Sequence, residues 1–359
     1  MAIKMKEVLM TMSNNQIRNA ILVADIHFGE HNNSTKHNDN LLEFFDFLIG
    51  KCKVYNPERV IILGDYFHDR NKVDVQTLNY GIESAKKLYN DPNVPTVDLI
   101  EGNHDLYQRY SRDISSLEVL KPYFRVYEKA QYDDSINGVF VPWLSNPDDY
   151  SEMNEVIQKH QPRFVFGHFE FNGFQMNKNF IMDQGDDIKK IEWYNDVEKI
   201  FTGHYHGRQD RDRVLYVGTP FPFNGNDAND FERGLCVLDL DSGEYSFEDY
   251  DKIKVLNVDY ETYQEIKDDL DENTQISVSF DDETDFETMD QVQKELEQNG
   301  VTDYKINYTP KKDHQDEEVD VQYVESIDQV VLNYIEEADI GSNYDKNLLK
   351  QVYQEVIDS

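Results

Sequence analysis

Five short apolar runs in the first two-thirds of the chain each end in polar residues of the kind that bind metal ions. The endings are Asp25-Ile26-His27, Gly64-Asp65, Gly102-Asn103-His104-Asp105, Gly167-His168 and Gly203-His204-Tyr205-His206. Short apolar runs bounded by turn residues are typical of buried strands. Open α/β sheets place their ligand sites beyond the carboxyl ends of the strands. We therefore expect a layered α/β fold with one polar site at its strand ends.

The segments between these strands distinguish an open sheet from a sandwich. Residues 38–53 and 77–88 carry apolar side chains at helical spacing and predict amphipathic helices. Beyond residue 120 short strands follow one another with few helices, which favours a second sheet packed on the first. We expect an α/β (α+β) fold of four layers, a β-sandwich flanked by helices.

Composition changes near residue 250, where a strand, helix, strand, helix, strand pattern begins. The sequence predicts an N-terminal extension (1–17), a main domain (18–250), a small α/β domain (251–310), a charged linker (311–320) and a helical segment (321–359). The last segment carries two amphipathic patterns separated by a Gly-Ser-Asn break, so we expect two helices there.

The chain has a formal net charge of −36. Residues 241–359 hold 34 of its 71 acidic residues and only 9 of its 35 basic residues. A protein that grips nucleic acid by itself presents Lys and Arg to the phosphates, and this charge opposes such binding. Solubility, adaptation to high salt, or a partner that supplies a basic surface would each account for the acidity.

Cysteine usage and hydropathy indicate the compartment. The two cysteines, Cys52 and Cys236, lie far apart in apolar surroundings, and we expect buried free thiols in a reducing environment. No apolar run reaches the length of about 18 residues that spans a membrane, and the N-terminal residues do not resemble a secretory signal. The predicted localisation is cytoplasmic.

Mixed His, Asp and Asn donors suit Mn²⁺, Fe²⁺ or Zn²⁺, and no thiolate is available to favour a softer ion. Two divalent ions held by a shared carboxylate can activate water and stabilise the anionic transition state of phosphoester hydrolysis. A histidine outside the ligand set can protonate the leaving oxygen, with a carboxylate orienting its ring and raising its pKa. A single motif of this kind is most often a turn or core feature, but five in this order indicate a two-metal phosphoesterase.

These motifs, taken in series, resemble the calcineurin-like metallophosphoesterases. The resemblance implies that Asp25, His27 and His206 hold one metal, that Asn103, His168 and His204 hold another, and that Asp65 bridges them. It also implies that His104 is the acid near the leaving group, with Asp105 behind it. No ligand position departs from the family pattern.

Further segments resemble the double-strand-break repair nuclease branch, especially the recombination endonuclease subunits of tailed phages. These segments are GDYFHD, GHFEFNGF and YVGTPFPF. The resemblance implies a two-metal DNA exonuclease and endonuclease that uses Mn²⁺ (or Mg²⁺, Fe²⁺ or Zn²⁺) and places His68 near the scissile phosphate. It implies that residues 251–310 form a DNA-binding cap. It also implies that residues 321–359 bind an SMC-like coiled-coil ATPase, as part of a homodimer within a heterotetramer, in the host cytoplasm if the chain is phage-encoded.

Alternatives remain open at this stage. His68 could line a turn, the terminal helices could pack on their own domain, and the chain could be a small-substrate phosphatase or nucleotide phosphodiesterase, or a non-catalytic scaffold. Five arginines flank the motifs and could contact DNA phosphates or be solvated: Arg109, Arg112, Arg208, Arg211 and Arg213. The remaining histidines lie in polar stretches, and we expect them to be solvated: His31, His37, His160 and His314.

Overall fold

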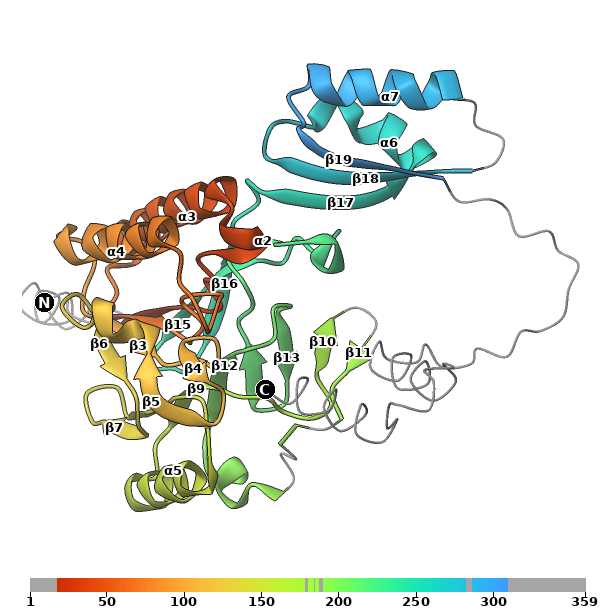
Figure 1. Ribbon diagram of the computed structural model, residues 1–359. Helices are drawn as coiled ribbons and strands as arrows, with labels where there is room; N and C mark the ends of the chain where they lie inside the picture. The colour runs from red at the N-terminus through yellow and green to blue at the C-terminus, as the bar shows by residue number, and fades with distance from the viewer. Residues whose placement is uncertain (1–17, 178–179, 184, 187–189, 282–285, 309–359) are drawn as a thin grey trace, which may run out of the picture. The chain divides into compact units, whose positions relative to one another are not determined.

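The computed structural model describes residues 18–177, 180–183, 185–186, 190–281 and 286–308. The predicted extension (1–17), the charged linker (311–320) and the helical segment (321–359) lie outside these ranges. The described main domain has two six-stranded sheets packed face to face, with helices on both outer faces (Figure 1). The expected four-layer sandwich is therefore confirmed.

The first sheet carries the first three motifs. Its strands, in spatial order, are β16 (Tyr245–Asp249), β15 (Gly234–Asp239), β1 (Asn19–Val23), β2 (Arg59–Ile62), β3 (Val97–Ile100) and β6 (Arg125–Tyr127). Strands β1, β2, β3 and β6 run parallel, whereas β15 and β16 are antiparallel to their neighbours. The parallel arrangement brings the carboxyl ends of β1, β2 and β3 to one edge.

The second sheet carries the last two motifs. Its strands, in spatial order, are β13 (Gln209–Arg211), β14 (Val214–Tyr216), β12 (Lys199–Gly203), β9 (Phe164–His168), β8 (Gly138–Val141) and β7 (Gln131–Asp133). Strands β8, β9, β12 and β14 are parallel. In β9 and β12 every residue is buried, as expected for strands covered on both faces.

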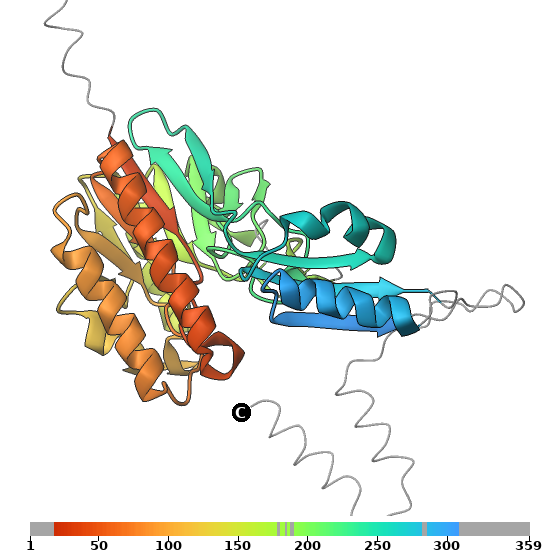
Figure 2. The same ribbon diagram turned by 90° about the horizontal axis from the view of Figure 1, so that it is seen from above.

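Helices α3 (Thr35–Tyr55) and α4 (Val75–Asn90) lie side by side and cover the outer face of the first sheet (Figure 2). The buried residues of α3 recur at three- and four-residue spacing: Leu41, Phe44, Phe45, Leu48, Ile49 and Cys52. The Ser34 side chain accepts a hydrogen bond from the backbone N–H of His37 at the start of this helix, and Asn56 ends it in the left-handed conformation.

Helix α5 (Pro147–His160) covers the outer face of the second sheet. Asn146 and Asp149 form a reciprocal capping box at its start, and Pro147 occupies the first turn, where its missing N–H costs nothing. Between the sheets, the rings of Phe140, Phe166 and Phe201 form a continuous stack, with centroid separations of 5.4 and 5.7 Å. The packed layers hold the strand ends in fixed positions.

Residues 254–308 form a small α/β unit with its own core. Its elements are β17 (Lys254–Asp259), α6 (Tyr260–Ile266), β18 (Thr274–Phe280), α7 (Phe286–Gln298) and β19 (Asp303–Tyr308). The three strands are parallel, and the order of elements is the one expected from the sequence.

Short elements complete the described part. They are the hairpins β4 (Leu106–Gln108) with β5 (Ser111–Ser115) and β10 (Gln175–Asn177) with β11 (Phe180–Ile181), the turn α2 (Glu30–Asn33), and four 3-10 turns at Ser116–Leu120, Glu192–Asn195, Gly225–Asp227 and Lys267–Asp269. Cys52 and Cys236 are free and buried, as predicted. Among the described residues, no helix combines the length and apolar character needed to cross a bilayer.

Candidate metal centre

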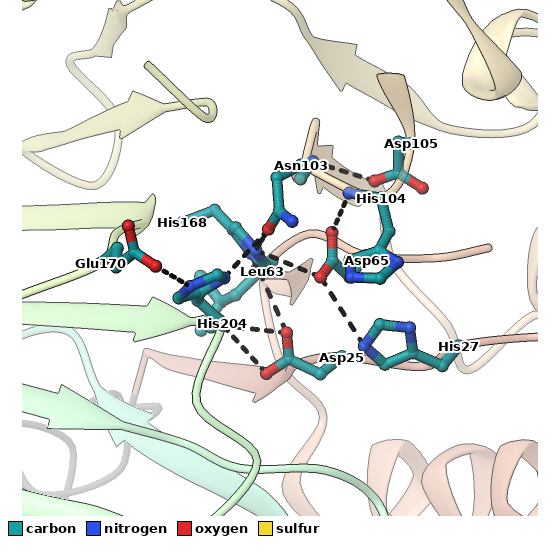
Figure 3. A network of polar contacts seen from close by, with 12 residues as sticks. Asp25, His27, Leu63, Asp65, Asn103, His104, Asp105, His168, Glu170 and His204 are labelled. Carbon is teal, nitrogen blue, oxygen red and sulfur yellow. Dashed lines mark hydrogen bonds and ion pairs between the residues drawn. The ribbon is translucent and has the colours of Figure 1, made fainter. Parts of the chain in front are cut away.

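The carboxyl ends of β1, β2 and β3 in one sheet and of β9 and β12 in the other bring the five sequence motifs together (Figure 3). Asp65, which follows β2, lies at the centre of the cluster. Its Oδ2 atom is 3.6 Å from His27 Nε2 and 3.3 Å from His168 Nε2. One carboxylate therefore faces ligand-type imidazoles from both sheets.

Asn103 lies on the side of the cluster that faces the second sheet. Its Oδ1 atom is 3.0 Å from His168 Nε2 and 2.9 Å from His204 Nδ1. His168 Nδ1 lies 2.7 Å from the carbonyl oxygen of Leu63, so Nδ1–H donates to that carbonyl. With Nδ1 fixed in this way, Nε2 faces the oxygens of Asn103 and Asp65, and, despite burial of the ring, the nearby Asp65 carboxylate raises the pKa of His168 to about 9. A divalent cation between these atoms would take the place of the Nε2 proton.

The remaining predicted ligands complete the cluster. Both oxygens of the buried Asp25 carboxylate accept the backbone N–H of His204, at 2.9 and 3.1 Å. The ring of His206 lies 5.0 Å from that of His27, measured between centroids. All seven residues predicted to bind metal therefore lie in one cluster.

The backbone that presents these side chains leaves the extended conformation where the strands end. Asp25, His27 and Asp65 have φ of 51°, 53° and 51°, and His204 has φ of 97°. Such left-handed conformations in residues other than glycine are strained and cluster at functional sites. The side chains therefore converge through turns after the strands end.

Glycine makes one of these turns possible. Gly64 has φ of 93°, and a Cβ atom on it would lie 2.3 Å from Nδ1 of His168. The two sheets can approach each other this closely only because residue 64 has no side chain.

The chemistry of the cluster fits divalent cations. The buried His27 Nε2 has no hydrogen-bond partner among the described residues. Burial lowers the pKa of His27 well below its usual value and that of His206 to about 4. Both rings are therefore neutral, with a lone pair available for a metal. Burial also raises the pKa of Asp25 to about 7, so this carboxylate lacks a sufficient positive partner.

Ligand-type atoms group in three ways within this region. The groups are Asp25 with His27 and Asp65, Asp65 with His168 and His204, and His27 with His68 and His104. The first two agree with the assignment implied by the family resemblance. The third competes with it, because it uses His68 and His104 as ligands instead of leaving them free for substrate.

His104 and Asp105 do not interact as predicted. The Asp105 carboxylate accepts backbone N–H groups from Gly102, Tyr66 and Phe67, at 2.9, 3.0 and 3.2 Å. The His104 ring is held instead by the carbonyl oxygen of His68, 2.6 Å from its Nδ1. Burial lowers the pKa of His104, whereas we expected a neighbouring carboxylate to raise it. The Asp105 carboxylate binds the backbone of the loop instead of the His104 ring.

His68 lies at the edge of the cluster beside His27 and His104 and is partly exposed. Its ring stacks on that of His104 with a centroid separation of 5.4 Å, and its Nδ1 is 2.6 Å from Oε2 of Glu30. Glu30 belongs to α2, where His31 and Asn32 have left-handed φ values of 57° and 56°. This strained turn presents the Glu30 carboxylate to His68.

The sequence motifs did not identify two carboxylates that lie near the cluster, Glu30 and Glu170. Glu170 Oε1 lies 3.3 Å from Nε2 of His204, so it orients the ring through the nitrogen that faces away from Asn103. Glu170 stands two residues after His168 in GHFEF, and that spacing was the available signal. Glu30 gave no signal, because its position depends on the left-handed turn.

Most of the flanking arginines form ion pairs or hydrogen bonds within the protein. Arg112 Nε lies 3.3 Å from Asp149, Arg208 pairs with Asp249 at 2.9 Å, and the Arg213 guanidinium donates to a backbone carbonyl. Only Arg211 is exposed, and Arg109 lines a cavity beside the site.

The prediction that the other histidines are solvated is wrong for His37 but holds for His31, which is exposed. His37 is buried, with its ring 4.8 Å from that of Phe223. His31 Nε2 lies 2.7 Å from the Phe223 carbonyl oxygen. His160 is exposed, as expected, and His314 lies outside the described residues.

Comparison with known proteins agrees with this geometry. The calcineurin-like phosphoesterase family model matches residues 19–208. Exonuclease subunit 1 of Enterobacteria phage T4 is 29% identical over 190 residues, which cover 51% of this chain and 53% of that protein. The chain thus matches about half the length of that relative.

Two solved structures are similar to part of this chain. The Pseudomonas putida nuclease MPE is 21% identical, with a TM-score of 0.27 and coverage of 55% of this chain and 66% of that chain. A dimetal phosphatase from Danio rerio is 11% identical, with a TM-score of 0.38 and coverage of 62% and 92%.

The family match covers more than half of the chain and includes all seven predicted ligand positions. The resemblance predicted from the motifs is confirmed. The chain belongs to the calcineurin-like phosphoesterases.

Proposed function

We propose that this chain is a divalent-metal-dependent nuclease that hydrolyses phosphodiester bonds at DNA ends during recombination, repair or replication. The observation that carries the proposal is the convergence of seven His, Asp and Asn side chains, with His68 and His104 beside them. Figure 3 shows this cluster and labels its members except His206 and His68. Family membership gives the reaction class, a phosphoesterase. Family membership does not identify the substrate, so DNA is the more specific part of the proposal.

Two features support DNA as the substrate. His68, in the GDYFHD segment, is partly exposed and stacks on His104, which supports a contact between this histidine and a phosphodiester. The relative from phage T4 is named an exonuclease subunit. A protein named as a subunit works with another chain, and this favours a partner here as well.

The proposed ligand sets are Asp25, His27 and His206 for one ion and Asn103, His168 and His204 for the other, with Asp65 shared by both. The bound ions, for which we propose Mn²⁺, would activate water and neutralise the charge of the transition state. Hard and intermediate donors of this kind accept Mn²⁺, and none of them is a thiolate.

The residues outside the ligand sets transfer a proton, contact the substrate or position other side chains. His104 donates Nδ1–H to the His68 carbonyl oxygen, which leaves Nε2 to face the substrate. When the ring is protonated, Nε2–H would pass its proton to the leaving sugar oxygen, and the ring would return to the neutral form that keeps Nδ1–H. His68 contacts the scissile phosphate, and Glu30 holds the His68 ring through Nδ1. Asp105 shapes the loop that carries Asn103 and His104 by binding three backbone N–H groups.

The acidic charge of this chain fits a complex in which another subunit provides most of the binding to DNA. A chain of net charge −36 attracts DNA poorly at long range, so we propose that an SMC-like coiled-coil ATPase supplies most of the affinity. Residues 321–359 would bind that partner, residues 251–310 would form a DNA-binding cap, and two copies of each chain would form a heterotetramer. For a phage-encoded chain the site of action would be the host cytoplasm.

The test is degradation of linear DNA by the purified chain with its partner and Mn²⁺, beside hydrolysis of a nucleotide monoester. The proposal predicts cleavage of DNA and loss of that cleavage in Asp65→Asn. Cleavage of the monoester with intact DNA would establish the phosphatase alternative. Absence of both, with metal bound, would establish the scaffold alternative.

A further inference from the structure

A cavity of about 230 Å³ opens directly beside the metal centre. His168, one of the proposed ligands, forms part of its wall, and Glu170, which holds His204, forms another part. Whatever occupies this cavity therefore lies next to the reacting phosphate. The other side chains that line it do not belong to the proposed metal site.

Planar groups form much of the wall. The Arg109 guanidinium lies 4.8 Å from the ring centroid of Trp143, and Trp143 Nε1 donates to the Arg109 carbonyl oxygen at 3.1 Å. This pair holds the turn between β4 and β5, where Tyr110 is 71% exposed although it lines the cavity. Unpaired bases stack on aromatic rings and on guanidinium planes of this kind.

The charges in the cavity disfavour a phosphate. Arg109 Nη2 is already paired with Oε2 of Glu170 at 2.9 Å. Asp186 adds a second carboxylate to the wall and accepts the Tyr150 hydroxyl at 3.1 Å. Two carboxylates against one paired guanidinium repel an anion, but they offer acceptors to a neutral ligand with N–H groups. Carboxylates accept hydrogen bonds from the amino groups of bases.

The opposite side of the centre has a different character. Another cavity, of about 320 Å³, is lined by His68, Arg70, Asn71 and His104, and Asp69 is the single carboxylate among its lining residues. Its donors suit phosphate oxygens. The two cavities therefore differ in the part of a nucleotide that each can accept.

We propose that the cavity beside His168 binds the base of an unpaired nucleotide adjacent to the scissile phosphate. Tyr110 and Arg109 stack on the base, and Glu170 and Asp186 accept hydrogen bonds from its amino group. A base inside a duplex is stacked on both faces and cannot enter, so the enzyme acts on single-stranded or frayed ends. This inference rests on the proposed nuclease function and names the form of DNA on which that site acts.

The test is a double-variant cycle that uses single-stranded oligonucleotides, Mn²⁺ and the full chain with its partner. One oligonucleotide carries a normal adenine beside the cleaved bond, and the other carries an abasic residue there. Tyr110→Ala removes the exposed stacking ring, and Tyr107→Ala is the matched control, because Tyr107 is 45% exposed on the same hairpin but does not line the cavity.

For the wild type we expect kcat/KM to fall about 10-fold on the abasic strand, equivalent to about 1.4 kcal/mol and within the range measured for base stacking. Tyr110→Ala should lose a similar factor on the normal strand and little more on the abasic one, whereas Tyr107→Ala should behave as wild type. Losses that multiply, or equal losses in the two tyrosine variants, overturn the proposal.

A second substrate tests the acceptors. Replacing the adenine by purine removes only the amino group, and we expect kcat/KM to fall several-fold in the wild type. Equal rates for adenine and purine would refute the role given to the carboxylates. If DNA is cleaved equally with and without the base, the cavity proposal alone fails. If no DNA is cleaved but bis(p-nitrophenyl) phosphate is, the nuclease function itself fails.

Discussion

Replacing Gly64 by alanine tests how closely the two sheets approach at the metal centre. Gly64 follows β2 with φ of 93°, and an added Cβ would lie 2.3 Å from Nδ1 of His168. The His168 ring cannot easily move away, because Nδ1 is 2.7 Å from the Leu63 carbonyl oxygen and Nε2 is 3.0 Å from Oδ1 of Asn103. The substitution therefore acts on backbone strain and on packing together.

The magnitude follows from these two costs. A left-handed conformation costs a residue other than glycine about 1–2 kcal/mol, and inserting a methyl group into a tightly packed site costs about 1–3 kcal/mol. We expect Gly64→Ala to lower the free energy of unfolding by about 2–5 kcal/mol, a large share of the roughly 5–15 kcal/mol that stabilises a typical protein.

The assay is urea unfolding in the presence of EDTA, so that metal binding does not contribute, followed by a count of bound Mn²⁺ in the folded protein. Displacement of His168 should reduce the count from two ions to one. Gly50→Ala is the control: Gly50 is exposed in α3 with no atom within 4 Å of an added Cβ, and we expect stabilisation of about 0.5–1 kcal/mol. Unchanged stability and two bound ions in Gly64→Ala would refute the close approach.

Three further predictions concern residues around the centre. His104→Ala should lower kcat for DNA cleavage by about 10²–10⁴-fold and leave two ions bound, and loss of an ion would instead make His104 a ligand. Glu30→Ala should lower kcat more than it changes KM, with an unchanged urea midpoint, because Glu30 only positions His68; Glu30→Gln should recover part of the rate, and an equal loss in both variants would contradict a positioning role. Arg233→Met should lower the free energy of unfolding by about 3–5 kcal/mol, because it leaves Asp227 and Asp230 without the buried guanidinium that pairs with both. In the same urea titration, Arg211→Met, at an exposed position, should change this free energy by less than about 1 kcal/mol.

The sandwich could be predicted because its elements obey local rules. The strands β1 and β2 are apolar on both faces, since each faces helices on one side and the second sheet on the other. Helix α3 was predicted over residues 38–53 and extends over Thr35–Tyr55. The added turns come from Ser34 and Asn56 at its ends, which the apolar spacing alone does not reveal.

The side chains that form the cluster could be predicted from the sequence, but the residues that contact and position them could not. Asp105 binds the backbone N–H groups of Tyr66 and Phe67, which are 39 and 38 residues away, and no local pattern predicts such a contact. His37 lies in a polar stretch yet packs on Phe223 from a distant loop. Long-range contacts of this kind decide which polar residue is buried, and a single sequence does not specify them.

The most direct test of the two-metal centre is a crystal structure with Mn²⁺, with anomalous scattering used to locate the ions. We predict two peaks: one bound by Asp25, His27 and His206, the other by Asn103, His168 and His204, with Asp65 contacting both. A single peak, or a peak bound by His27, His68 and His104, would contradict this assignment and the roles given to the two free histidines.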